Sequence, residues 1–447
     1  MKNTFLLLTF MLAIGAAGAQ DKFFTIKGKV TDNKTKEALP GVTIHVQGKQ
    51  VFTQTNGDGN YVLKVPEQFR GSNVIYNVFG YARDTMTVKE AAKRPNVKLK
   101  RGGAINLNKV TVSEYTPQSL VKEAVNRIPQ NFWTDTMVGT YFYRDVRQLE
   151  DSLYLFDEMV FDALRVGYDK HHALERTGGR EGNLVKSNYK AILFSRLLVN
   201  DTAYIKKITG GTGSFRLTYS DNDVLVDPVE IPNTTSYLST SKRSLKSWKY
   251  KMETFTATED VEYYLVTMTK SLNSFGPTEY RIVLTIRRSD LAIVRVEFNY
   301  DSKENDYPWP MNKLSQKVGR DSIHYTERKV CNYGEVEGKM TLTSYTEHET
   351  ATFFYSNDTM YGQREQHFVY DVQCVLTSQR RGDASFFDAN NIQTPVRIAV
   401  SDRQGGELRY DEDFWNQYNF VPIEAALLEK LEKKLESTSS DLKTLKQ

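Results

Sequence analysis

The chain has 447 residues, which is long for one compact domain, and domains of about 100 to 200 residues predict two or three of them. It carries 59 Lys and Arg against 55 Asp and Glu, a formal net charge of +4. With 26% charged and 40% hydrophobic residues, this composition excludes a disordered chain and a collagen, and the small net charge argues against nucleic acid as a partner. Aromatic residues make up 12% of the chain. Because aromatic side chains favour strands, we expect a mainly β protein.

Residues 1–19 have the pattern of a secretory signal peptide. Lys2 precedes an apolar run over Phe5–Ile14, and small residues follow at 17–19. The run is about half as long as the roughly 20 residues of a membrane-spanning helix. We therefore expect cleavage before Gln20 and no transmembrane segment in the mature chain. The protein should then be exported to the periplasm, and the sequence leaves open whether it associates with the outer membrane.

Residues 22–113 contain short stretches in which apolar and polar residues alternate. The apolar positions of three stretches are Phe24, Ile26 and Val30, then Val42, Ile44 and Val46, then Tyr61, Leu63 and Val65. A period of two predicts strands, and the residues Leu39–Gly41 and Asn56–Gly59 between them favour turns. Asn56–Gly59 lacks the ligand spacing of an EF-hand calcium loop. These features predict a small β-sandwich.

Five segments of this region resemble the carboxypeptidase-like regulatory domain. They are Gly28–Asp32, Leu39–Ile44, Thr55–Tyr61, Phe79–Tyr81 and Leu107–Val112. The resemblance implies a Greek-key, prealbumin-like sandwich over residues 22–113, of the kind common in exported proteins of Bacteroidota. It also implies that this part of the chain carries no catalysis.

Residues 115–425 predict a large antiparallel β domain with a few covering helices. Thr116–Pro117, an apolar stripe and then Pro129 predict a capped helix that ends at the second proline. Strand patterns follow over much of the remainder, including a hairpin that turns at Arg288–Asp290. A sheet with one apolar face must cover that face or close on itself, so we expect a half-barrel or a curved sheet.

Further segments of this second region are similar to uncharacterised Bacteroidota envelope proteins that carry the same sandwich. They are Tyr143–Asp145, Glu158–Tyr168, Gly210–Gly213, Asp290–Phe298 and Asp413–Asn419. In those proteins the second part resembles the lipoprotein-carrier half-barrel. The resemblance implies a non-enzymatic cell-envelope binding protein for an apolar or acyl ligand or an outer-membrane partner. Two alternatives stay open: a hydrolase, zinc carboxypeptidase-like or glycan-directed, with an unrecognised site, and an accessory component of an outer-membrane receptor.

Residues 426–447 predict a C-terminal amphipathic helix and a tail. Leu427, Leu428, Leu431 and Leu435 have helical spacing, with Glu and Lys between them. We expect this helix to dock on the sheet, and a membrane-surface or partner helix is the alternative.

No catalytic, cofactor-binding or metal-binding residue is assigned from the sequence. His172 and Glu175 have the spacing of a zinc carboxypeptidase pair, with His324 as a distant third ligand. Between Glu175 and His324, apolar and polar residues alternate with a period of two, as in strands. The helices that such peptidases place between their strands are not predicted there. Nucleophile-elbow, phosphate-loop and Cys-x-x-Cys patterns are also absent from the sequence.

The two cysteines, Cys331 and Cys374, both lie in predicted strands. An oxidising compartment would permit a disulfide between them. Their spacing in the sequence does not decide whether they are close enough in space, so the question stays open here.

Six Asp-Ser/Thr-apolar triplets resemble the O-glycan acceptor site of Bacteroidota. They are Asp84-Thr85-Met86, Asp135-Thr136-Met137, Asp151-Ser152-Leu153, Asp201-Thr202-Ala203, Asp321-Ser322-Ile323 and Asp358-Thr359-Met360. The resemblance implies bulky, solubilising glycans on the surface. The alternative is that Asp-Thr and Asp-Ser pairs begin turns.

Overall fold

The structure of the chain is a computed structural model. It describes residues 23–102, 114–165, 167–168, 190–201, 242–258, 261–272, 278–302, 320–358, 362–382 and 411–438.

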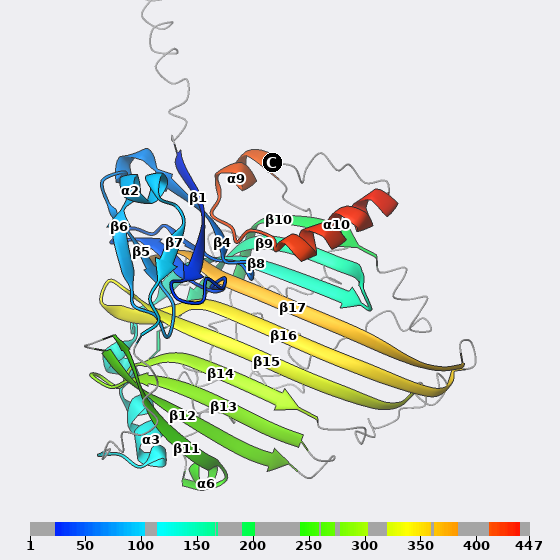
Figure 1. Ribbon diagram of the computed structural model, residues 1–447. Helices are drawn as coiled ribbons and strands as arrows, with labels where there is room; N and C mark the ends of the chain where they lie inside the picture. The colour runs from blue at the N-terminus through cyan, green and yellow to red at the C-terminus, as the bar shows by residue number, and fades with distance from the viewer. Residues whose placement is uncertain are drawn as a thin grey trace, which may run out of the picture.

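The N-terminal strands form two small sheets that share one core (Figure 1). The first has the order β4 (Asn60–Pro66), β1 (Phe23–Asp32) and β7 (Val97–Leu99). The second has the order β3 (Phe52–Gln54), β2 (Thr43–Val46), β5 (Asn73–Asn77) and β6 (Asp84–Thr87). A short 3-10 turn, η1 (Glu67–Phe69), and a helix, α2 (Val88–Lys93), connect strands. Ile26, Ile44 and Leu63 are buried in the core between the sheets, as the alternation predicted.

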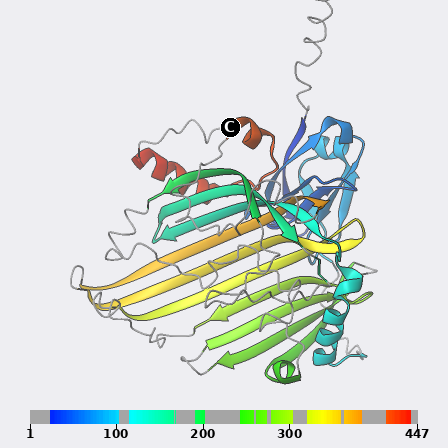
Figure 2. The same cartoon turned by 180° about the vertical axis from the view of Figure 1, so that it is seen from behind.

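The rest of the described chain is built around one ten-stranded antiparallel sheet (Figures 1 and 2). Its first five strands, in sheet order, are β10 (Lys190–Asn200), β9 (Ser152–Arg165), β8 (Met137–Leu149), β17 (Gly362–Arg381) and β16 (Lys339–Asp358). The other five are β15 (Arg320–Val336), β14 (Ile293–Asp301), β13 (Thr278–Arg287), β12 (Val261–Leu272) and β11 (Lys249–Thr258). The hairpin predicted at Arg288–Asp290 joins β13 to β14. The prediction of a mainly β fold with a small sandwich and a large antiparallel sheet is confirmed.

One face of the large sheet packs against α3 (Pro117–Asn126) and α4 (Ile128–Asn131), and we call it the α3 face. Thr116 caps α3 through its side chain and Pro117 opens the helix, as predicted. Pro129 does not stop helical structure, because the short α4 begins just before it and proline is tolerated in a first turn. Figure 2 shows α3 near one end of β11 to β14. Buried α3 side chains such as Leu120 and Val121 join the core of the sheet, each stabilising the fold by about 1.5–3 kcal/mol.

The opposite face of the sheet meets the sandwich and the C-terminal segment, and we call it the sandwich face. The C-terminal segment contains α9 (Glu412–Gln417) and α10 (Ala425–Thr438), while the short α6 (Lys242–Lys246) precedes β11. Leu431 and Leu435 of α10 pack on Val146 and Phe156 of the sheet. The C-terminal helix therefore docks on the sheet. Within the described residues, no helix is both long and apolar enough to cross a membrane.

Three of the Asp-Ser/Thr-apolar triplets lie wholly within the described residues. Asp84 is the first residue of β6, Met137 is the first of β8 and Ser152 is the first of β9. Each triplet therefore stands where a strand begins. The triplets that start at Asp201, Asp321 and Asp358 include residues or side chains outside the described part.

Candidate functional site

The turn at Asn56–Gly59 fixes the sandwich to the C-terminal segment. The Asp58 carboxylate accepts a hydrogen bond from the backbone N–H of Ala425, the first residue of α10, at 2.7 Å. The Gly57 N–H donates to the Glu424 carboxylate at 3.0 Å. The Asp58 carboxylate thereby satisfies one of the unpaired N–H groups at the N-terminus of α10. The predicted turn is present, and it also caps a helix that lies 367 residues further along the chain.

Asn419 completes this attachment by mimicking a neighbouring strand. Its side chain accepts from the Lys64 N–H at 2.6 Å and donates to the Lys64 C=O at 3.0 Å, on the edge strand β4. The Lys64 ammonium donates to the backbone carbonyls of Trp415 and Asn416. Burial, and then the nearby cations Lys27 and Arg196, lower the pKa of Lys64 to about 8. The sandwich is thereby held in one position over the sheet.

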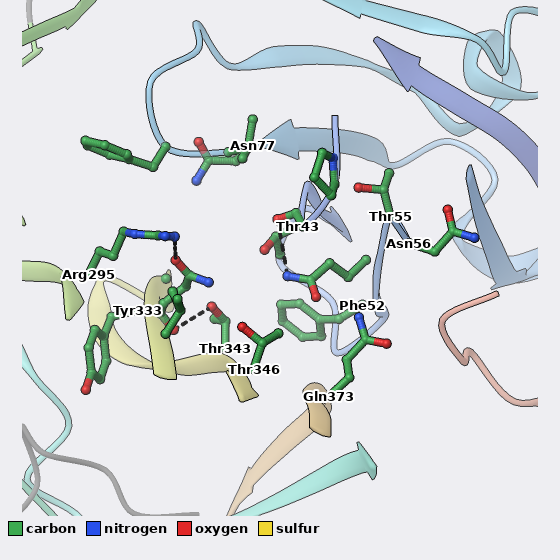
Figure 3. A pocket seen from close by; sticks show the side chains of 18 of the residues that line it. Thr43, Phe52, Thr55, Asn56, Asn77, Arg295, Tyr333, Thr343, Thr346 and Gln373 are labelled. Atoms are coloured by element: carbon green, nitrogen blue, oxygen red, sulfur yellow. Dashed lines mark hydrogen bonds between the residues drawn. The ribbon is translucent and has the colours of Figure 1, made fainter. Parts of the chain in front are cut away.

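A cavity of about 1000 Å³ lies between the sandwich and the sandwich face of the sheet (Figure 3). This volume is at the upper end of the ~300–1,000 Å³ range of small-molecule sites, which often form at domain interfaces. In Figure 3 the side chains of the sandwich face those of the sheet across the cavity. The residues used below are Thr43, Phe52 and Asn77 from the sandwich and Arg295, Thr346 and Gln373 from the sheet. We call this cavity the interdomain cleft.

A hydrogen-bonded chain forms part of the floor of the interdomain cleft and joins the two domains. Arg295 donates to the Asn332 side-chain oxygen at 2.8 Å, and the Asn332 amide donates to Ser344 Oγ at 3.0 Å. The Gln54 amide of the sandwich reaches the same Ser344 Oγ at 3.2 Å. Gln54 is only 2% exposed, yet its Oε1 has no hydrogen-bond partner. A buried carbonyl oxygen usually has a donor, so Gln54 Oε1 is an exception among the buried polar atoms of the described residues.

The cationic side chains around the cleft are mostly compensated by the protein itself. Arg295 and Arg328 both contact the Glu297 carboxylate. Burial opposes ionisation of Glu297, but its hydrogen bonds to the two guanidinium groups outweigh burial and lower its pKa to about 2. His348 pairs with Asp371 at 2.6 Å. The cleft is therefore polar without a large uncompensated charge.

Aromatic rings stand on the sandwich side of the cleft and at its edge. Phe52 stacks on His45 with ring centroids 5.5 Å apart. Phe79 meets Tyr263 of the sheet edge-to-face at 5.8 Å. The Phe79 side chain is 37% exposed, whereas the other large hydrophobic side chains among the described residues are buried or partly buried. Phe52 is only 4% exposed, so Phe79 is the ring that gives the cleft an accessible apolar surface beside its hydrogen-bonding groups.

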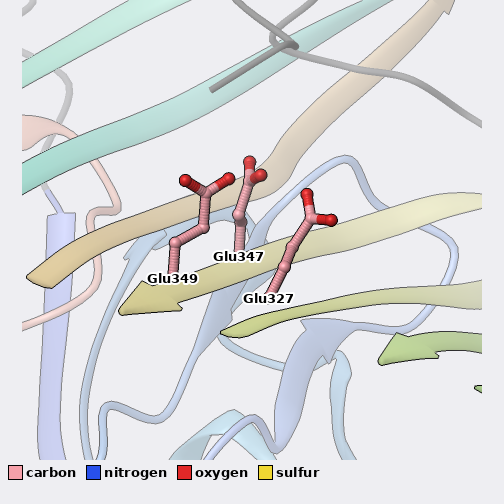
Figure 4. Close-up of side chains that lie close together, drawn as sticks. All are labelled: Glu327, Glu347 and Glu349. Atoms are coloured by element: carbon pink, nitrogen blue, oxygen red, sulfur yellow. The ribbon is translucent and has the colours of Figure 1, made fainter. Parts of the chain in front are cut away.

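A second polar cluster lies on the α3 face, within the sheet itself (Figure 4). Carboxylate oxygens of Glu327, Glu347 and Glu349 lie within 4.8 Å of one another. The Lys329 ammonium contacts Glu327 and, at 2.9 Å, Glu347, while the Tyr345 hydroxyl donates to Glu347 at 2.6 Å. Oxygen ligands of this type suit a hard cation. Lys329 already supplies a positive charge to two of the three carboxylates, so the cluster is explained without a metal.

Protonation compensates the third carboxylate of this cluster. Burial, followed by the adjacent Glu347 and then Glu327 carboxylates, raises the pKa of Glu349 far above 4.5. Two close carboxylates in a low-dielectric site cannot both ionise cheaply. Glu349 is therefore neutral at pH 7 and can donate its proton to Glu347.

The zinc hypothesis gains no support from the described residues. His172 and Glu175 lie outside the described residues. His324 is in β15 and its Nε2 lies 3.2 Å from an Asp301 carboxylate oxygen, which gives the ring a local partner.

The two cysteines lie on the α3 face, on two strands that are separated by a third. Cys331 of β15 and Cys374 of β17 are both in register with Tyr345 of β16, which lies between them. Two strand spacings separate the Cα atoms by about 9.5 Å, whereas a disulfide requires less than about 7 Å. Both are buried thiols that form no bridge, so the disulfide that the sequence left open is excluded.

The sequence did not identify the cleft residues. Gln54, Asn332 and Thr346 are isolated polar residues in strands, and each faces the cleft only because the sandwich docks on the sheet. The one signal in the sequence was the polar side chains that alternate along β15, β16 and β17. Such a pattern fits a face exposed to solvent as well as a face covered by another domain, so it could not identify the cleft.

Comparisons with known proteins identify the first domain and little of the second. A model of the CarboxypepD_reg-like domain family matches residues 26–112. Among curated proteins, no significant match was found. A LolA superfamily protein from Nitrosomonas europaea aligns at 12% identity and a TM-score of 0.20, covering 61% of this chain and 97% of that one. A protein of unknown function from Bacteroides fragilis, described as membrane-associated, aligns at 9% identity and a TM-score of 0.14, covering 79% and 97%.

TM-scores this low carry no argument about fold or function. What the comparisons establish concerns the N-terminal domain, whose family match agrees with its sandwich of two small sheets. The N-terminal domain of this protein is a CarboxypepD_reg-like domain.

Proposed function

We propose that the protein is a non-enzymatic binding protein that holds its ligand in the interdomain cleft. The observation that carries this proposal is the cavity of about 1000 Å³ lined by both domains. Its floor is preorganised by the chain of hydrogen bonds from Arg295 to Gln54. Side chains that are already held in place lose little freedom when a ligand binds.

The chemistry of the cleft favours binding over catalysis. His348 and Asp371 form a pair that could act as a general base. Within the described residues, however, no hydroxyl or thiol is hydrogen-bonded to His348, and its cross-strand neighbour on β15 is Arg328. A nucleophile–base arrangement needs such a contact. In the described part of the chain, the His348–Asp371 pair therefore lacks the neighbouring nucleophile that a hydrolase of this type would need.

The described α3 face is a less suitable place for an apolar or acyl ligand. Its apolar surface contacts α3 and α4 at one end. Further along the strands, the acidic cluster of Glu327, Glu347 and Glu349 interrupts it. An acyl chain laid along this face would meet the polar groups of this cluster instead of a continuous apolar surface, which is unfavourable.

Native mass spectrometry of the protein recovered from its own cells tests the proposal. Thr346→Trp would place an indole in the cleft, while Thr352→Trp makes the same change on the same face of β16, outside the cleft. We expect wild type and Thr352→Trp to carry a bound mass that Thr346→Trp lacks. An equal bound mass on both variants, or none on any of the three proteins, would show that the cleft is not the binding site.

We also propose that the protein is exported and acts in the periplasm, with residues 1–19 removed. The pattern of Lys2, the apolar run and the small residues supports this. N-terminal sequencing of the mature protein is expected to begin at Gln20, and an N-terminus at Met1 would contradict export by this route.

A further inference from the structure

We propose that the ligand of the interdomain cleft is a neutral, hydroxyl-rich molecule, and specifically an oligosaccharide. This inference rests on the proposed binding function and names its ligand class. It follows from three properties of the cleft: compensated charges, unsatisfied neutral polar groups, and aromatic surfaces beside them.

The cleft does not require a charged ligand. Arg295 and Arg328 share Glu297, and Arg144 and Arg196 share the buried Glu158. The acidic residues Glu335, Glu337 and Asp371 also line the cleft and offset the remaining positive charge. An anion would have to compete with these internal carboxylates for the guanidinium groups. Arg83 and Arg328 are exposed at the cleft lining, and exposed cations are screened by water and salt. The charge distribution therefore favours a neutral ligand.

Several neutral polar side chains of the cleft have hydrogen-bonding capacity to spare. Within the described residues, the side chains of Thr43, Asn77 and Thr346 form no hydrogen bond to another residue, and all three line the cleft. An apolar ligand would cover these groups without satisfying them, which is unfavourable. A hydroxyl both donates and accepts, so a hydroxyl-rich ligand can satisfy these amide and hydroxyl groups.

Aromatic rings complete the match to a sugar. The C–H faces of a sugar ring are apolar, while its hydroxyls project around the edge. Phe79 offers an exposed ring near Tyr263. Phe52 lies on the sandwich wall of the cleft (Figure 3) but is only 4% exposed, so Phe79 is the ring on which a sugar would stack. A volume of about 1000 Å³ accommodates several sugar units, so the ligand is an oligosaccharide rather than a single monosaccharide.

A peptide is the competing ligand of similar polarity. Peptides are commonly recognised by adding a strand to an exposed sheet edge. The sandwich edge nearest the sheet is β3, which has only three residues, all buried, and which contacts β17. The spare hydrogen-bonding groups of the cleft belong to side chains instead, which favours the sugar.

The test is binding of the full mature protein to an array of neutral oligosaccharides, with sulfated and uronic-acid oligosaccharides and an unmodified peptide library as competing classes. We expect binding to a neutral oligosaccharide. Asn77→Ala should weaken it at least tenfold, whereas Asn73→Ala, at the other end of β5 and outside the cleft, should change it less than twofold. Phe79→Ala should also weaken binding tenfold or more, and Phe79→Trp should restore it.

Each other outcome overturns the inference. Selective binding of an acidic oligosaccharide or of a peptide would replace the ligand class, and binding to no neutral oligosaccharide would eliminate it. Equal affinities for Asn77→Ala and Asn73→Ala would place the sugar elsewhere on the protein. Native mass spectrometry of Thr346→Trp, which reports loss of the co-purified mass, is a separate measurement. If that mass is lost as expected but no sugar binds, the cleft remains the binding site and only the ligand class is wrong.

Discussion

At the scale of single residues, the clearest expectation concerns Glu349. Its folded pKa lies above its unfolded value, so the folded protein keeps a proton that the unfolded chain releases above about pH 4.5. Stability is therefore lost as pH rises from that value toward the folded pKa, by up to about 1.4 kcal/mol per pH unit. Glu349→Gln keeps the neutral shape and should not show this loss.

Thermal or urea unfolding at pH 5, 7 and 9 measures the effect. We expect the stability of Glu349→Gln relative to wild type to increase with pH. Glu365→Gln, at an exposed position of β17, serves as the control and should follow wild type. Parallel pH profiles for wild type and Glu349→Gln would show that Glu349 is not held neutral by its surroundings.

A second residue-scale prediction concerns the pair at the rim of the cleft. The hydrogen bond to Asp371 raises the pKa of His348 above 6.5. The pair thus contributes stability below pH 6.5, and the contribution disappears as pH rises through the folded pKa. Asp371→Asn should lower the pKa of His348, as measured by NMR titration of its ring protons. An unchanged titration curve would mean that the pair does not form in solution.

At the scale of elements, the cap of α10 is open to test. Asp58 of the sandwich accepts from the first N–H of α10, and loss of a helix cap costs about 1 kcal/mol. Asp58→Ala should lower the free energy of unfolding by that amount and speed amide exchange in α10, whereas Asp58→Asn retains an acceptor oxygen and should behave more like wild type. Unchanged exchange in α10 would show that the turn does not hold the helix.

The elements were largely predictable because their signals are local. Alternation placed β1, β2 and β4, and the Thr116–Pro117 cap placed α3, since period and capping act within a few residues. Pro129 was misjudged because a proline that ends one helix can also open another. The turn at Asn56–Gly59 was expected, but its role as a cap for α10 was not, because the partner lies at the far end of the chain.

At the scale of the whole molecule, the sequence could not predict the cleft. Its walls come from strands such as β2, β5, β15 and β16, which meet only after the sandwich has docked. That docking depends on specific hydrogen bonds such as those between Asn419 and Lys64. Neither residue carries a motif. The family resemblance identified the sandwich, but a fold does not specify which of its surfaces binds.

The central claim is that the ligand lies between the sandwich and the sheet. The most direct test is an experimental structure of the protein isolated with its native ligand. We expect additional density in the interdomain cleft, in contact with Asn77 on one side and Thr346 on the other. Density on the α3 face near Glu347 and Glu349, with an empty cleft, would contradict this account and would move the binding site to the opposite side of the sheet.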